Sequence, residues 1–155
     1  ILRKYYDSPS ITTDVICGFP GETDEEFNKS LNFVKDIKFS MIHVFKYSRR
    51  AGTKACDMPE QVDEAVKNHR SSIMLDAADK LTASYAESFT GSVQNCLVEE
   101  TVTINGKLYY IGHNERYMKL AFEAEKINGD IINTIVKVIP EQYEGDEVLL
   151  CVCAR

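Results

Sequence analysis

The spacing of apolar residues changes near residue 86, and this change limits the chain to a fold built from two different halves. Before it, a β-branched run at 11–17 leads into an amphipathic stretch, and the same order repeats from 41–47 into a long helix that ends near Tyr85. Strand, helix, strand, helix predicts parallel strands joined by crossovers. Two such units cannot close a sheet, so residues 1–85 are expected to be part of a larger α/β domain.

Both helices of the first half can be assigned a buried face from their spacing. Thr23 and Glu26 have the spacing of a capping box, which predicts a helix start there. Along this first helix, Phe27, Leu31 and Val34 form one apolar stripe. For the long helix after Pro59, the predicted stripe consists of Val62, Val66, His69, Ile73, Ala77 and Leu81.

Residues 86–155 contain short β-rich runs separated by turn residues. The expected strands are 89–99, 101–104, 107–112, 117–123, 130–139 and 145–152. Asn105-Gly106 predicts a tight hairpin, because both turn positions need positive φ. Further turns are expected at 128–130 and 144–146. Five or six short strands in such a length predict a small closed antiparallel β-barrel of the oligonucleotide-binding kind, since closure removes exposed edges.

The charge balance argues against general affinity for nucleic acid, and the second half is the more acidic. The chain has 18 Lys and Arg against 24 Asp and Glu, a net charge of −6. No apolar run is long enough for a membrane span, so a cytoplasmic protein is expected. The chain opens with Ile1 and not with methionine, which suggests a processed or truncated chain.

Five cysteines are scattered through the sequence, which favours reduced thiols over a disulfide framework. Cys151 and Cys153 alternate on an expected strand, so both side chains should share one face. Two small buried side chains are favoured there over a metal site, because no second Cys or His pair lies nearby.

The segment DVICGFPGET, residues 14–23, places bare backbone at the carboxyl end of a parallel strand, where α/β proteins build ligand sites. It resembles the fifth-strand motif of radical S-adenosylmethionine (SAM) enzymes, in which this strand and turn flank the SAM adenosine. A second segment, HVFKYSRRAGTKA at 43–55, continues to Lys67 and Arg70. It resembles the tRNA methylthiotransferases, most closely the subgroup that acts on threonylcarbamoyladenosine.

These resemblances imply specific roles for residues of the first half. The candidate cofactor-binding residues, which would form part of the SAM pocket, are Ile16, Gly18, Glu22, Phe45 and Tyr47. Arg50, at the family's arginine position, could bind a carboxylate or phosphate with both guanidinium nitrogens.

The second half resembles a TRAM domain, which in this family presents the tRNA anticodon stem-loop to the active site. GHNERY at 112–117 lies where the family often has G-x-T-x-x-Y, with Asn114 in place of threonine. The resemblance implies RNA contacts by stacking and phosphate binding. The candidate residues for these contacts are His113, Arg116, Tyr117 and Lys119.

Together the resemblances identify residues 1–85 as the C-terminal part of a radical SAM domain and 86–155 as a TRAM domain. The intact enzyme is expected to add a methylthio group to C2 of N6-threonylcarbamoyladenosine at tRNA position 37, using SAM and [4Fe–4S] clusters. The CxxxCxxC triplet that binds such a cluster is absent, so this chain alone is expected to be inactive and to hold no metal.

Several alternatives stay open. The substrate could be isopentenyladenosine in tRNA or a ribosomal protein, and the chain could be a stand-alone RNA-binding module or carry a purely structural barrel. A sheet cut from a larger one would expose an apolar surface, so a homodimer or a domain swap is also expected.

Overall fold

The chain forms two compact units in a computed structural model, which describes residues 1–127 and 129–154. One unit, called here the βα unit, comprises Ile11–Thr82. The other, the barrel unit, comprises the chain from Ala83 onward together with Ile1–Ser10. The division falls within one continuous helix, α3 (Glu64–Glu87). The predicted sequence of a mixed α/β part followed by an all-β part is confirmed.

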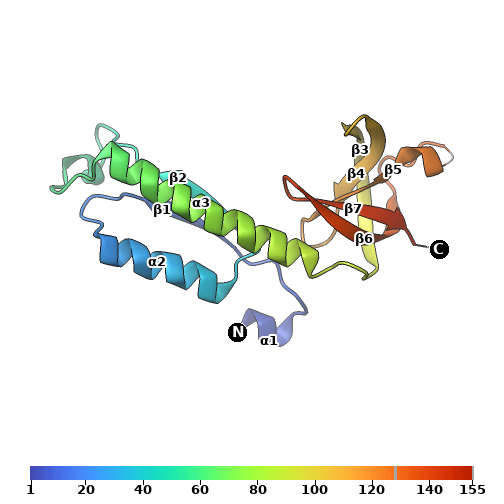
Figure 1. Cartoon of the computed structure of the whole chain (residues 1–155), viewed down its shortest axis with the longest axis horizontal. Coiled ribbons are helices and arrows are strands. Elements are labelled where there is room, and N and C mark those ends of the chain that lie inside the picture. Colours follow the sequence, from blue (N-terminus) through green and yellow to red (C-terminus); the bar gives the residue numbers. More distant parts are fainter. Residues whose placement is uncertain (128, 155) are drawn as a thin grey trace. The chain divides into compact units, whose positions relative to one another are not determined.

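The βα unit contains two parallel strands, as predicted. Strand β1 (Thr12–Cys17) pairs with β2 (Met41–Lys46) in a register that begins with Thr12 opposite Met41. Helix α2 (Asp24–Ile37) connects them, and a short 3₁₀ helix, η1 (Lys54–Asp57), precedes α3 (Figure 1).

Helix α2 begins with the predicted capping box. The Thr23 hydroxyl accepts a hydrogen bond from the Glu26 N–H at 3.2 Å, and the Glu26 carboxylate accepts one from the Thr23 N–H at 2.9 Å. Its predicted stripe of Phe27, Leu31 and Val34 is buried. Local sequence signals therefore suffice to predict where this helix begins and which of its faces is buried.

The predicted buried face of α3 is wrong at two positions within the helix, and a third predicted position, Val62, lies before the helix begins. Val66 and His69 are exposed, whereas the buried positions include Arg70 and Met74. Arg70 can be buried because the carboxylates of Glu22 and Asp24 pair with its guanidinium group. A buried His69 would need a similar partner to offset the loss of its hydration. Ala77 is buried as predicted.

The core of the βα unit covers only one face of its two-stranded sheet. It joins residues from both strands and both helices. Its buried members are Cys17, Phe27, Leu31, Val34, Phe39, Ile42, Met74, Ala77 and Ala78. On the opposite face Ile16 and Phe45 are 53% and 52% exposed.

The barrel unit contains a closed five-stranded barrel, which confirms the predicted closure (Figure 1). The strands are β3 (Gln94–Ile104), β4 (Lys107–His113), β5 (Lys119–Glu123), β6 (Ile135–Gly145) and β7 (Val148–Cys153). They follow the order β3-β4-β5-β7-β6 around the ring. A short 3₁₀ helix, η2 (Ala124–Lys126), follows β5, and helix α1 (Leu2–Tyr5) lies in the N-terminal segment.

The prediction of a wholly antiparallel barrel is wrong at one junction, because β5 and β7 are parallel. A ring with an odd number of strands cannot alternate in direction throughout, so one parallel pair is required. The first two expected strands are a single strand, β3, with a bulge between Val98 and Glu100, and its start lies after a turn at 89–92.

The turn predictions have mixed outcomes. Asn105 and Gly106 have φ of 49° and 80°, which confirms the hairpin between β3 and β4. The turn expected at 144–146 lies slightly later, since β6 continues to Gly145 and the link to β7 is Asp146–Glu147. The turn expected at 128–130 includes Asn128, which lies outside the described residues.

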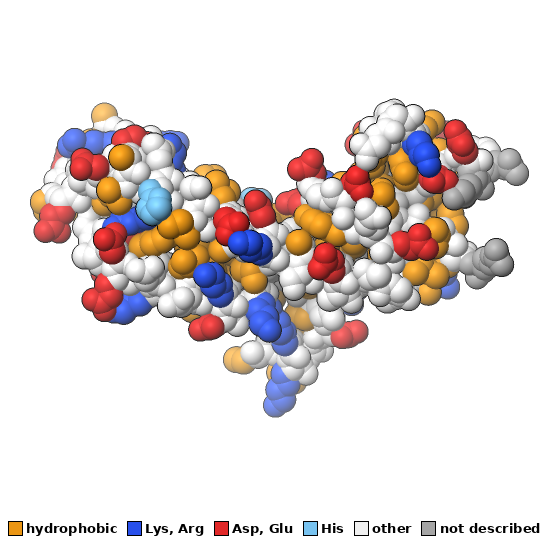
Figure 2. All heavy atoms as spheres, viewed as in Figure 1, with side chains coloured by type: hydrophobic (Ala, Val, Ile, Leu, Met, Phe, Trp, Pro, Cys, Tyr) orange, Lys and Arg blue, Asp and Glu red, His pale blue; other side chains and the backbone are white. Residues whose placement is uncertain are grey.

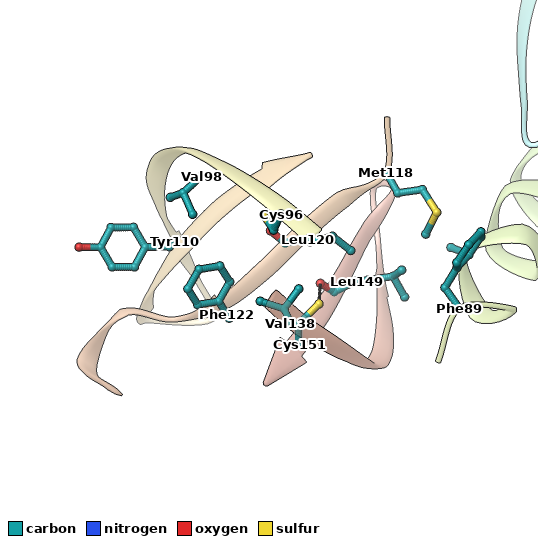
Figure 3. Close-up of a cluster of buried hydrophobic side chains, with 11 residues drawn as sticks. Phe89, Cys96, Val98, Tyr110, Met118, Leu120, Phe122, Val138, Leu149 and Cys151 are labelled. Carbon is teal, nitrogen blue, oxygen red and sulfur yellow. Dashed lines mark hydrogen bonds between the residues drawn. The ribbon is translucent and has the colours of Figure 1, made fainter. Parts of the chain in front are cut away.

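Apolar side chains from all five strands fill the barrel, as Figure 3 shows for Val98, Leu120 and Leu149 among others. Cys151 is buried in this core and Cys153 packs against it, as their alternation predicted. None of the five cysteines, all of which lie within the described residues, forms a disulfide.

Candidate functional site

The turn between β1 and α2 has a fixed main-chain path. Gly18 and Gly21 both have positive φ, 75° and 85°, which side chains rarely tolerate. A Cβ on Gly18 would overlap Cγ of Lys67, so the space beside this glycine is already filled by α3. The Glu22 N–H closes the turn by donating to the Phe19 carbonyl at 2.9 Å.

Glu22 uses its carboxylate to hold this turn. Its Oε2 accepts the Gly18 N–H at 2.7 Å and is 2.7 Å from a guanidinium nitrogen of Arg70. Arg70 also donates to the Glu22 carbonyl at 2.9 Å and to Asp24 Oδ1 at 2.6 Å. Burial opposes the charge on Arg70, but these hydrogen bonds outweigh that effect, so the pKa of Arg70 is raised.

The open face of the sheet brings two of the predicted cofactor residues together. Ile16 and Phe45 are register partners on β1 and β2, so their side chains stand side by side. Tyr47 follows the end of β2 and packs edge-on against Phe19, with ring centroids 5.4 Å apart. The Tyr47 hydroxyl is buried and has no hydrogen-bond partner among the described residues.

Two further groups near this turn have different characters. Arg50 is exposed in the loop after β2, and its carbonyl accepts a hydrogen bond from the Thr53 hydroxyl at 2.8 Å. Cys17 lies at the end of β1, where burial, followed by the charge of Glu22, raises the pKa of its thiol to about 11. Its thiol is therefore protonated and unreactive at neutral pH.

The barrel brings three of its four predicted RNA residues together. His113 and Lys119 are register partners on β4 and β5, and the His113 ring stacks on Tyr117 with centroids 4.5 Å apart. Tyr117 is 76% exposed and has a φ of 63°. Glu99 lies 2.8 Å from His113 Nδ1, so an acidic group borders this cluster.

The fourth residue, Arg116, points elsewhere. Its Nε donates to the Ser8 carbonyl at 3.0 Å, and a terminal nitrogen donates to the Asp7 carbonyl at 3.1 Å. The guanidinium also lies over the Phe89 ring at 5.3 Å. Arg116 thus binds the N-terminal segment to the barrel, and the Tyr85 hydroxyl donates to the same Ser8 carbonyl at 2.8 Å.

The loop between these residues is held from inside by Asn114. This buried side chain accepts hydrogen bonds from the N–H groups of Arg116 and Met118, both at 3.0 Å, and donates to Gln94. The pattern explains how Tyr117 can be held with positive φ at the surface. Charges on the barrel face shown in Figure 2 are mainly acidic.

Known proteins show what this chain is similar to. No family model matches it. It is 41% identical over 138 residues to the threonylcarbamoyladenosine tRNA methylthiotransferase MtaB of Bacillus subtilis, which covers 88% of this chain and 30% of the relative. It is 33% identical over 139 residues to the tRNA-2-methylthio-N(6)-dimethylallyladenosine synthase of Acetivibrio thermocellus, covering 89% and 29%. The chain is a homologue of the tRNA methylthiotransferases.

The resemblance stated from the sequence is thereby confirmed. A second methylthiotransferase of the threonylcarbamoyladenosine type, from Thermotoga maritima, is 35% identical over 141 residues, 91% of this chain and 32% of the relative. The chain spans about a third of the length of the curated relatives it matches.

The residues of the βα unit fit the nucleoside part of SAM, the cofactor that the methylthiotransferase resemblance implies. Ile16 and Phe45 offer an apolar surface of half-exposed side chains, which suits a flat purine. Gly18 has no side chain and could contribute only main-chain contacts, and Lys67 fills the space where a Cβ would lie.

The residues described do not fit an iron–sulfur cluster. Within residues 1–127 and 129–154, no three His, Cys, Asp or Glu side chains lie close enough together to hold a metal ion. The buried thiols are also poor ligands, since burial raises the pKa of Cys96 and Cys151 to about 12. No helix in the same residues has the length and apolar character of a membrane span.

The sequence did not predict the positions of three residues that lie near the two candidate sites of this chain. Leu97 pairs with His113 on one side and with Ile135 on the other. These three neighbouring residues form a row across β4, β3 and β6, so two apolar side chains lie next to the candidate residue His113. The continuous apolar run at 96–98 was the available signal, because a strand with one buried face should alternate. Arg70 lies in the segment that carries the family resemblance, but its burial and its pairing with Glu22 have no signal in the local sequence.

Proposed function

We propose that this chain is the C-terminal part of a radical SAM tRNA methylthiotransferase, with the βα unit belonging to the radical SAM domain and the barrel unit to a TRAM domain. The proposed substrate is N6-threonylcarbamoyladenosine at tRNA position 37, which receives a methylthio group at C2. The protein would act in the cytoplasm, where tRNA is modified.

The observation that carries this proposal is the pairing of Ile16 with Phe45 beside the clamped turn at 18–22. Both lie toward the carboxyl ends of parallel strands, where α/β proteins place ligands. The similarity to enzymes that make methylthio-adenosines in tRNA supports SAM as the ligand.

In this proposal SAM, bound to a [4Fe–4S] cluster, supplies the radical chemistry that an unactivated C–H bond requires. The residues of this chain would bind and orient. Ile16 and Phe45 would hold the adenine ring and exclude water from it, and the main chain at Gly18 would contact its edge. Tyr47, packed on Phe19, would close one end of the pocket. The cluster ligands would lie outside this chain.

The barrel unit would hold the tRNA anticodon stem-loop. Its strand order and its single parallel pair are compatible with the five-stranded oligonucleotide-binding barrels. The stacked His113 and Tyr117 would receive an unpaired base, and Lys119 would contact phosphate. Arg50, exposed in the βα unit, is the proposed second contact to a phosphate or carboxylate.

The proposal is tested by the affinity of the full-length enzyme for S-adenosylhomocysteine, a stable relative of SAM. Phe45→Ala removes half of the proposed apolar surface and is expected to weaken binding roughly tenfold, the typical effect of losing one aromatic stacking partner. Phe33→Ala is the matched control, because Phe33 is equally exposed, at 58%, on α2 of the same unit. Unchanged binding in Phe45→Ala would reject this nucleoside site.

A second candidate substrate is dimethylallyladenosine, which the name of the Acetivibrio thermocellus relative contains. A ribosomal protein substrate, a stand-alone RNA-binding role and a purely structural barrel are further alternatives. Methylthiolation of tRNAs carrying one or the other modified adenosine would separate the first two. Self-association through the open sheet face is also part of the proposal, and sedimentation of the 155-residue chain would test it.

A further inference from the structure

Helix α3 carries a buried arginine whose hydrogen bonds go to the end of the β1–α2 turn and to the first residue of α2. Arg70 is 5% exposed, and its two terminal nitrogens donate to the Glu22 carbonyl, the Glu22 carboxylate and the Asp24 carboxylate. Burying a guanidinium is costly unless it is paired. Residues 22–24 lie 46 to 48 positions away in sequence, so this pairing is a tertiary contact within the βα unit.

The same Glu22 oxygen links Arg70 to the main chain of the turn. Oε2 accepts from Arg70 and from the Gly18 N–H, both at 2.7 Å. A displaced Glu22 carboxylate would therefore release Gly18, whose φ of 75° depends on the turn staying closed. Gly18 is two residues after Ile16, so the clamp acts next to the exposed apolar pair.

Lys67, one turn earlier on α3, ties the end of the neighbouring strand. Its stem lies against Gly18, its Nζ is 3.4 Å from the Tyr47 carbonyl and 5.8 Å from the Tyr47 ring centroid, and Glu64 balances its charge at 2.8 Å. One helix face thus holds the ends of both strands that carry the candidate nucleoside pocket.

Arginine suits this position for a geometric reason. Its Nε is buried and has no hydrogen-bond partner among the described residues, so the site does not satisfy every donor of the guanidinium. What it uses is the fork, with one terminal nitrogen on Glu22 and the other on Asp24. A lysine keeps the charge but cannot present two donors at fixed separation.

We propose that Arg70 is a positioning residue for nucleoside binding, which sets the path of the Gly18–Glu22 turn through Glu22 and thereby the shape of the pocket beside Ile16 and Phe45. This inference rests on the proposed function. It assigns a role to an α3 residue that does not itself touch the ligand.

The test compares Arg70→Lys and Glu22→Gln in the full-length enzyme. Each is expected to weaken S-adenosylhomocysteine binding by about tenfold, because a turn that keeps its binding path only about a tenth of the time lowers the apparent affinity by that factor. In a double-mutant cycle the two effects should be strongly non-additive, because both variants break the same link. Hydrogen exchange resolved to the Gly18 amide should be faster in both.

Two variants keep the test decisive. Lys80→Met removes an exposed pair with Asp76 on the same helix and should change neither binding nor Gly18 exchange. Should Arg70→Lys unfold the protein, Asp24→Asn weakens only the outer, exposed half of the fork, and a smaller loss of affinity with faster Gly18 exchange is expected.

The outcomes separate this inference from the function on which it rests. Faster Gly18 exchange in Arg70→Lys with unchanged ligand affinity would overturn the positioning role and leave Arg70 purely structural, provided that Phe45→Ala still weakens binding. If neither Phe45→Ala nor Arg70→Lys affects binding, the nucleoside site itself is wrong. Additive effects in the cycle would also overturn the link through Glu22.

Discussion

The two units bury their sheets in different ways, and the contrast indicates where each is open to a ligand. In the barrel unit the five strands form a closed ring around a core that includes Val98, Leu120 and Phe122. In the βα unit α2 and α3 cover one face of the strand pair, while Ile16 and Phe45 stay exposed on the other. Parallel sheets are normally covered on both faces. The open face is thus available for a ligand or for further protein, whereas the barrel can bind only on its outside.

The largest expected effect tests this contrast through stability. Phe122 is 1% exposed in the barrel core, and Phe122→Ala should lower the free energy of unfolding by about 3–5 kcal/mol. Ile16→Ala, on the open face, should change it by less than about 0.5 kcal/mol. Urea unfolding of the 155-residue chain measures both. A loss of similar size in the two variants would mean that the face around Ile16 is covered, for example by a second copy of the chain.

Features predicted correctly from sequence depend on neighbouring residues. The capping box at Thr23 and the Asn105-Gly106 hairpin need only local backbone geometry, and both are present. The prediction of the buried face of α3 failed because Arg70 is buried by pairing with carboxylates 46 to 48 residues away. No local pattern contains that information.

The same distinction applies to the barrel and its candidate site. Closure was predictable from short strands with frequent turns, but the parallel contact between β5 and β7 is a consequence of ring topology. The grouping of His113, Tyr117 and Lys119 followed from their nearness in sequence. The diversion of Arg116 to Ser8 did not, because it requires a contact across 108 residues.

The buried thiols of the two units should contribute differently to the pH-dependence of stability. Burial raises the pKa of Cys17 to about 11 in the βα unit, and that of Cys96 and Cys151 to about 12 in the barrel. In the unfolded chain a thiol loses its proton near pH 9, whereas the folded thiol keeps it. Unfolding therefore releases protons above pH 9, so stability falls as pH rises, by at most ~1.4 kcal/mol per pH unit for each thiol.

Urea unfolding at pH 8.5 and 10.5 measures this effect. The double variant Cys96→Ala and Cys151→Ala should lose about twice as much of the pH-dependence as Cys17→Ala, because it removes two such thiols. An unchanged pH-dependence in the double variant would show that the barrel thiols already ionise in the folded state, and that its core is less closed than its packing indicates.

The smallest expected effect concerns two cations of the barrel surface that lose the same charge when replaced by glutamine. Lys119 lies beside His113, 3.7 Å from Glu147, whereas Arg116 is bound to carbonyls of the N-terminal segment. If the barrel binds tRNA as proposed, Lys119→Gln in the full-length enzyme should reduce the slope of log affinity against log salt by about 1. Arg116→Gln should leave the slope unchanged.

Arg116→Gln should instead speed hydrogen exchange in the N-terminal segment around Asp7 and Ser8, because it removes two hydrogen bonds to their carbonyls. An equal loss of salt slope in both variants would show that Arg116 leaves the segment to contact phosphate. If neither variant changes the slope, the barrel makes no phosphate contact through Lys119 or Arg116, and its role is purely structural. The row of Leu97, His113 and Ile135 would then be a surface for protein, since its apolar ends need no nucleic acid to cover them.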